Sequence, residues 1–167
     1  MKLSRVRSAD WVAGIGGLVL FVSLWLHWYG FDAAALIQTR GSAGTLVTNG
    51  LAVPDVTAWQ AFSEIDVLLA LFALPAIGVP VSAALSKVPT APVAFTVVAT
   101  TASFFAVLLV LFRLLDQPGS NELVAVKYGA WIGLAGAVVA FAGSWLAMAD
   151  EHTPGAVPPQ LTVRPAP

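Results

Sequence analysis

The chain has 167 residues, of which 58% are hydrophobic and 10% are charged, and its formal net charge is −1. A soluble domain carries roughly 25% charged residues, so this composition excludes an ordinary soluble domain. The net charge excludes an electrostatic surface for nucleic acid. The sequence contains no cysteine, which excludes disulfides, a thiol nucleophile and thiolate metal sites.

Four apolar stretches have the length of a membrane span, which needs roughly 20 residues. A chain this short cannot bury four such stretches in a soluble core. The sequence therefore predicts an all-α fold, a four-helix transmembrane bundle that forms a single membrane domain over residues 1–150. The expected spans are residues 11–29, 64–86, 92–115 and 127–149.

Three basic residues, Lys2, Arg5 and Arg7, precede the first expected span. The positive-inside rule then predicts a cytoplasmic N-terminus, and four spans return the C-terminus to the cytoplasm. A basic start followed by an apolar run is also typical of a signal peptide. We favour an uncleaved helix, because the small residues at 33–35 follow the bulky stretch HWYGFD at 27–32.

Residues 30–63 form the expected outer loop, and residues 151–167 a proline-rich, disordered cytoplasmic tail. Within the loop, Asn49-Gly50 predicts a hairpin over residues 44–53, because both residues tolerate the positive φ of a type I′ turn. Thr57 and Gln60 have the spacing of a capping box. A helix is therefore expected to begin near Thr57, before the second span.

Aromatic residues cluster near the ends of the expected spans, as the amphipathic rings of a membrane interface do. One group belongs to the inner end, at Trp11 and Trp145. The group expected at the outer end comprises Trp25, Trp28, Tyr29, Trp59, Tyr128 and Trp131.

Two stretches, SLWLHWYGF at residues 23–31 and TAWQAFSEIDVLLAL at residues 57–71, carry a resemblance. Together they resemble a group of uncharacterised small four-helix integral membrane proteins of actinobacteria, which pair a Trp-Tyr motif after the first helix with an AW-x-AF…DVLL opening of the second. The resemblance covers roughly the first half of the chain. It implies a four-span layout in the bacterial inner membrane, and it implies no activity.

Asp66 and Arg113 form the first candidate site. The turn between the second and third spans is short, so these spans should be antiparallel neighbours, with Asp66 and Arg113 at nearly the same depth. We expect an ion pair between them, because pairing lowers the cost of placing a charge in the membrane. We favour a structural role for it over a proton or cation site, since a relay needs several titratable groups.

His27 is a second candidate, because the reference pKa of a histidine side chain is about 6.5 and such a group can sense pH. The simpler interpretation is a polar ring bonded to nearby backbone or water. A metal site is not expected, since His152 should lie on the opposite side of the membrane. Ser23 lies one helical turn from His27 but has no oxyanion donors in view, so we do not expect catalysis.

Small residues recur every three or four positions in the last span, which places them on one helix face. Such a seam lets two helices approach closely. We favour internal packing against the small face of the first helix, at Ala13, Gly14, Gly17 and Ser23, over a contact between copies of the chain. The seam comprises Gly129, Gly133, Gly136, Ala140, Gly143 and Ala147.

A polar row, Thr96, Thr100 and Ser103, shares one face of the third span. These hydroxyls can bond to helix carbonyls or to a neighbouring helix, or they can line a permeation path. A path would need more polar lining than the Ala, Leu and Val of the other spans offer.

These observations favour a non-enzymatic, multi-pass protein of the cell membrane, without metal or cofactor, that acts as an accessory or structural subunit. Its expected partners are the lipid bilayer and other membrane proteins or a second copy. Trp28, Tyr29, Trp59 and Phe62 are the candidate partner contacts, and they are equally explained as interface anchors. The alternative is a small oligomeric transporter or channel that uses Asp66 and His27.

Overall fold

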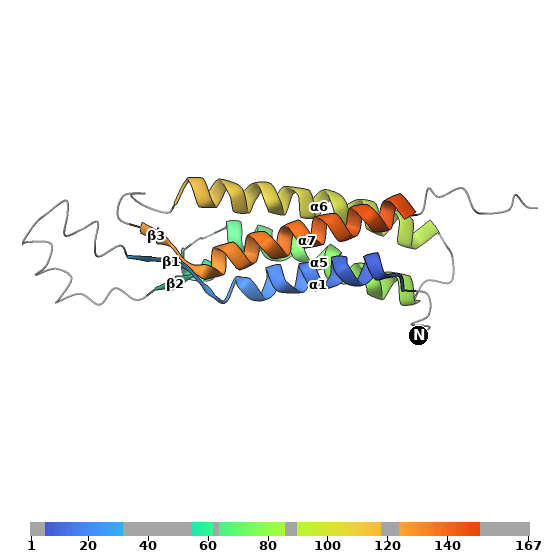
Figure 1. Cartoon of the computed structure of the whole chain (residues 1–167), viewed down its shortest axis with the longest axis horizontal. Helices are drawn as coiled ribbons and strands as arrows, with labels where there is room; N and C mark the ends of the chain where they lie inside the picture. The colour runs from blue at the N-terminus through green and yellow to red at the C-terminus, as the bar shows by residue number, and fades with distance from the viewer. Residues whose placement is uncertain (1–5, 32–54, 62–63, 86–89, 118–123, 151–167) are drawn as a thin grey trace, which may run out of the picture.

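The computed structural model describes residues 6–31, 55–61, 64–85, 90–117 and 124–150 (Figure 1). Four long helices dominate it: α1 (Ser8–Ser23), α5 (Ile65–Leu85), α6 (Thr90–Leu115) and α7 (Tyr128–Asp150). Three of them contain stretches long and apolar enough to cross a membrane, namely Ile65–Leu85, Ala94–Leu115 and Tyr128–Ala149. The expected spans at 64–86, 92–115 and 127–149 lie within two residues of these three helices.

The four helices run side by side along the long axis of the molecule. Helix α1 packs against α7 and α5, and α6 packs against the same two helices on the other side. Helices α1 and α5 are antiparallel, because Gly14 lies on Pro80 and Gly17 on Ala76. Helices α1 and α7 are antiparallel too, because Gly136 lies on Leu20 and Gly143 on Ala13. The large apolar side chains that remain exposed point outward from all four helices.

The first helix is shorter than the expected span at 11–29. Helix α1 has 16 residues and ends at Ser23. Three tight turns follow, in which the amides of Leu24, Trp25 and Leu26 donate to carbonyls three residues back. Residues His27–Phe31 then form strand β1. The prediction was wrong here because the apolar pattern continues past Ser23, whereas the aromatic residues after it favour an extended backbone.

The structure adds a small antiparallel sheet to the helices, and the all-α prediction did not include this sheet. Strand β1 lies between β2 (Val56–Thr57) and β3 (Val124–Val126). Tyr29 pairs with Val56 on one side and with Val126 on the other. All three strands lie at the end of the molecule where α1 ends and α7 begins (Figure 1), so the sheet caps this end of the helices.

The segment before α5 forms a separate short helix, α4 (Ala58–Ala61). The amide of Thr57 donates to Oε1 of Gln60 at 3.0 Å, which is the half of the expected capping box that the Gln side chain supplies. The predicted hairpin at residues 44–53 and the tail at 151–167 lie outside the described residues.

Helix α5 continues through Pro75 and Pro80 without a break. Pro80 is buried against α1, where an added Cβ on Gly14 would lie 2.7 Å from its Cγ. A Cβ added to Gly17 would lie 2.9 Å from the carbonyl oxygen of Ala73. The two glycines therefore let α1 approach α5, whereas they were expected at the contact with α7.

Candidate functional site

Trp28 fastens the sheet to the helices. Its side chain is fully buried, and its Nε1 donates a hydrogen bond of 2.7 Å to the carbonyl of Ser23, the last residue of α1. The indole also covers α7, where an added Cβ on Gly133 would lie 2.8 Å from its Cζ2. One side chain thus joins the end of α1, strand β1 and the first turns of α7.

Tyr29 makes the corresponding contact with α6. It is 1% exposed, and its hydroxyl donates a hydrogen bond of 2.8 Å to the carbonyl of Arg113 in the last turn of α6. Burial raises the pKa of Tyr29 to about 12, against the opposing effect of the positive charge of Arg113. The phenol therefore stays protonated and keeps its donor.

Trp28 and Tyr29 were expected to be exposed partner contacts, and this prediction was wrong. Neighbouring residues of a strand point to opposite faces, and here both faces are covered: one by α1 and α7, the other by the end of α6. Of the other two candidates, Trp59 is half-buried and Phe62 lies outside the described residues.

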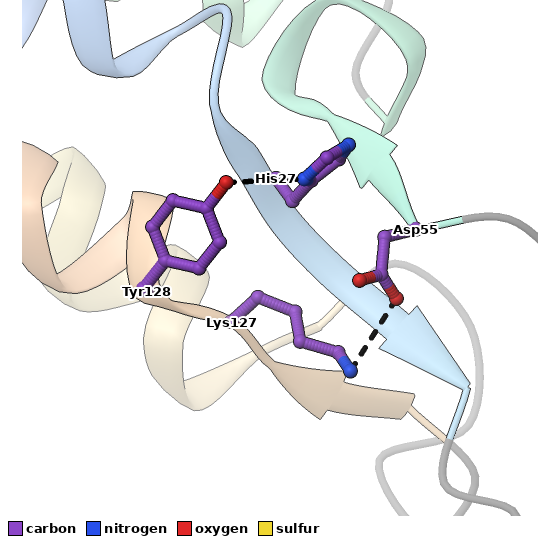
Figure 2. A network of polar contacts seen from close by, with 4 residues as sticks. All are labelled: His27, Asp55, Lys127 and Tyr128. Atoms are coloured by element: carbon purple, nitrogen blue, oxygen red, sulfur yellow. Dashed lines mark hydrogen bonds and ion pairs between the residues drawn. The ribbon is translucent and has the colours of Figure 1, made fainter.

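Two polar contacts join segments of the sheet to one another and to α7 (Figure 2). Lys127, just after β3, forms an ion pair with Asp55, just before β2, with 3.3 Å between Nζ and Oδ1. His27 of β1 and Tyr128 of α7 are hydrogen-bonded, with 3.1 Å between Nδ1 and the hydroxyl oxygen. The ion pair joins the segments next to the two edge strands, and the hydrogen bond joins β1 to α7. Both contacts therefore stabilise the sheet.

Gly30 makes room for the ion pair. A Cβ added to this residue would collide with Oδ1 of Asp55 and Cε of Lys127. The pair therefore passes over the central strand at its one position without a side chain. Sequence reasoning missed Gly30, Asp55 and Lys127, because no local pattern relates residues that are separated by up to 97 positions in the chain.

The predicted ion pair of Asp66 and Arg113 is not formed. Asp66 is 3% exposed, and its Oδ1 accepts a hydrogen bond of 2.8 Å from the amide of Val67. A carboxylate in the first turn of a helix is stabilised by free amides and by the helix dipole, so α5 itself supplies what Arg113 was expected to supply.

The glycine seam of α7 lies against α1. A Cβ on Gly136 would lie 2.6 Å from the amide nitrogen of Leu20, and one on Gly143 would collide with the backbone of Ala13. Gly129 and Gly133 approach His27 and Trp28 in the same way, and Ala140 and Ala147 are buried. This is the internal packing that the sequence favours over a contact between copies.

The polar row of α6 faces the interior. Thr96, Thr100 and Ser103 are all buried, and the hydroxyl of Thr100 donates to the carbonyl of Thr96 at 2.8 Å. Farther along, the interior toward the sheet is filled by a cluster of apolar residues that includes Leu20, Leu69 and Val110. The row therefore does not continue as a polar path in the described part of the molecule.

The aromatic residues divide into two classes. Those that the structure leaves about half exposed are Trp11, Trp25, Tyr128, Trp131 and Trp145, whereas Trp28 and Tyr29 belong to the core. Trp25 also contacts Trp59, with 5.4 Å between ring centroids. The described residues contain no group of three or more His, Asp or Glu side chains that could hold a metal ion.

Comparison of the chain with protein-family models, with curated proteins and with solved structures finds no match in any of the three.

Proposed function

We propose that the chain is a multi-pass protein of the bacterial inner membrane, in which α1, α5, α6 and α7 cross the bilayer as a four-helix bundle. The large apolar side chains on the outside of all four helices support this arrangement. Helix α1 has 16 residues, or about 24 Å, and the tight turns after it extend the apolar segment to Leu26.

The same proposal places both termini in the cytoplasm and the sheet outside. It rests on Lys2, Arg5 and Arg7 before α1 and on the tendency of such residues to stay in the cytoplasm. Because the chain has no cysteine, single cysteines can test it. In intact spheroplasts, a membrane-impermeant maleimide should label Gln60→Cys at once and Ser8→Cys only after lysis; the opposite pattern would invert the topology.

We infer a non-enzymatic role, that of an accessory or structural subunit that binds another membrane protein through the sheet. The observation that carries this inference is the way the sheet is held. Trp28 and Tyr29 anchor it to α1, α6 and α7, while the ion pair of Asp55 and Lys127 joins the segments next to its two edge strands. Because the sheet is already held in one position, it loses little conformational freedom when a partner binds.

The alternative of a transporter that uses Asp66 and His27 receives less support from the geometry. His27 lies exposed on the sheet and is bonded to Tyr128, whereas Asp66 is buried at the start of α5. The apolar cluster around Leu20 and Leu69 fills the interior at this end.

Site-specific photocrosslinking in native membranes tests the partner role. The probe replaces Gln60, which is exposed on α4, and in a control it replaces Val138, which is exposed in the middle of α7. We expect one defined membrane protein to be captured from Gln60 and only lipid from Val138. Lipid adducts alone from both positions would contradict the accessory role.

A further inference from the structure

Two buried serines have hydroxyl groups without a hydrogen-bond partner. Ser103 of α6 is 1% exposed and Ser144 of α7 is fully buried, and neither Oγ reaches a partner in the part of the chain that the structure describes. A hydroxyl in a helix can donate to a carbonyl three or four residues back, as Thr100 does to Thr96. The two serines do not, although an unpaired buried hydroxyl costs more than an average hydrogen bond contributes.

Both serines lie beside Thr100. The last turn of α6 and the first turns of α7 both meet β1, so these two helices run in opposite directions (Figure 1). Phe104 of α6 contacts Phe141 of α7, with 5.8 Å between ring centroids. Away from the sheet, Ser144 is three residues beyond this contact on α7, and Thr100 is four residues beyond it on α6. Thr100, Ser103 and Ser144 therefore form a buried hydroxyl cluster where α6 packs on α7.

The interior differs on the two sides of the hydroxyl cluster. Toward the sheet, it is filled by apolar side chains that include Leu20, Leu69 and Val110. Away from the sheet, the buried Thr96 continues the polar row, six residues from Thr90, where α6 begins. Among the described residues, the apolar cluster in that half is small, and its members are Ala13, Val79, Ala99 and Phe95. Water therefore has the shorter and more polar route to the hydroxyl cluster from the end away from the sheet.

We propose that Thr100, Ser103 and Ser144 bind a few water molecules inside the bundle, and that this water exchanges only through the end away from the sheet. This inference rests on the membrane insertion proposed above. A buried water makes about three hydrogen bonds to polar groups that lack a partner. It can accept from both serine hydroxyls and donate to the oxygen of Thr100, whose own hydrogen is donated to Thr96. An ion fits less well, because neutral hydroxyls cannot balance its charge.

The bound water also accounts for the attraction between α6 and α7. The glycines of α7 lie against α1 and β1, so they do not give α6 a close backbone contact. Hydrogen bonds between helices are another source of attraction in a membrane, and water shared by hydroxyls of both helices supplies them.

Single cysteines test for this water, because the chain has no cysteine of its own. A thiol reacts as the thiolate, and burial in apolar surroundings suppresses that form, so a hydrated cysteine reacts faster with silver ions than a dry one. Ser103→Cys and Ser144→Cys are compared with Ala106→Cys, a matched control that is fully buried in the apolar cluster of the same helix. We expect both serine positions to react about tenfold faster than Ala106→Cys, from the side of the membrane at which Ser8→Cys is labelled. The thiols that remain are counted with a fluorescent maleimide after denaturation.

Two results would overturn the inference. If Ser103→Cys and Ser144→Cys react no faster than Ala106→Cys from either side, the hydroxyl cluster is dry. If they react faster only from the side at which Gln60→Cys is labelled, the water enters from the sheet.

Membrane insertion is tested separately by Leu108→Cys, which is exposed on α6. In lipid this cysteine should react slowly from both sides. A fast reaction means that α6 faces water, and the membrane proposal then fails whatever the result at the two serines.

The unaltered protein provides a second measurement that no folding defect can mask. In solid-state NMR of the protein in lipid, magnetisation transferred from water should reach the amides of Thr100 and Ser144 but not that of Ala106. Equal transfer to all three amides, or transfer to none of them, would contradict the bound water.

Discussion

Trp28 and Tyr29 show how adjacent residues of a strand can hold a sheet on a set of helices. The indole of Trp28 donates to the end of α1, and the phenol of Tyr29 donates to the end of α6. The last carbonyls of a helix have no partner within the helix. The carbonyl of Ser23 also accepts from the amide of Leu26, so Trp28 supplies its second donor. The two side chains in turn pair their own buried N–H and O–H groups, and leaving such groups unpaired costs more than an average hydrogen bond contributes.

Trp28→Phe should lower the free energy of unfolding by about 1–3 kcal/mol, because it removes the hydrogen bond to Ser23 and leaves space beside Gly133. Thermal unfolding in lipid nanodiscs measures this loss. The matched control is Trp25→Phe. Trp25 is 54% exposed, so this substitution should change the free energy of unfolding little. Equal losses for the two variants would mean that the buried indole has no special role.

The phenol of Tyr29 should titrate late. Its pKa is raised by burial to about 12, whereas an unfolded tyrosine titrates near 10. The stability that Tyr29 contributes is therefore complete below pH 10 and is lost as the pH rises from 10 through 12. The chain has only two tyrosines, so the difference in ultraviolet absorbance between the wild type and Tyr29→Phe isolates this group. A midpoint near 10 would contradict the buried hydrogen bond.

At the scale of the elements, the contact between α1 and α7 depends on small residues from both helices. Gly16 lies on the backbone of Ala140, and Gly136 lies on the backbone of Leu20. In a membrane, lipid provides no hydrophobic driving force between helices, so close packing has to provide the attraction. The seam that supplies the packing is thus used within one chain.

Gly136→Ala should destabilise the protein by about 1–3 kcal/mol, as overpacking does, because the new Cβ would lie 2.6 Å from the backbone of Leu20. Gly78→Ala is the control. Its Cβ would lie 2.7 Å from the ring tip of Phe95, a side chain that can rotate away. Thermal unfolding of both variants in the same detergent compares them, and a larger loss for Gly78→Ala would argue against the backbone contact.

At the scale of the whole molecule, the large side chains exposed on the helices are apolar, as the proposed insertion in lipid requires. Leu108 is 45% exposed in α6. In a soluble protein, a lysine at such a position would change stability by about 0.5 kcal/mol or less. At the centre of a membrane span it costs about 2.5–3.5 kcal/mol.

Leu108→Lys should therefore reduce the amount of folded protein recovered from membranes several-fold, in line with this insertion cost. Ser8→Lys, a substitution at the exposed first residue of α1, is the control and should be recovered like the wild type. Fluorescence-detected size-exclusion chromatography of solubilised membranes measures both. Equal recovery of the two variants would indicate that α6 does not face lipid.

Helices α5, α6 and α7 could be placed from the sequence because each is a run of about twenty apolar residues, and only a helix satisfies its own backbone over such a length. The position of the seam in α7 follows from the helical period in the same way. The end of α1 could not be placed, because Leu24, Trp25 and Leu26 continue the apolar pattern beyond Ser23. Strand β1 depends on Val56 and Val126, which are remote in the chain.

The sequence by itself determined that the chain carries long apolar helices and that small residues line one face of α7, since both properties are local and periodic. Only the tertiary structure decided that Trp28 and Tyr29 are buried, that Asp66 takes its donor from α5 and that Asp55 reaches Lys127 over Gly30. These outcomes depend on which distant segments meet. The register of α1 on α7 follows the same rule, because it is set by the backbone contacts of their glycines.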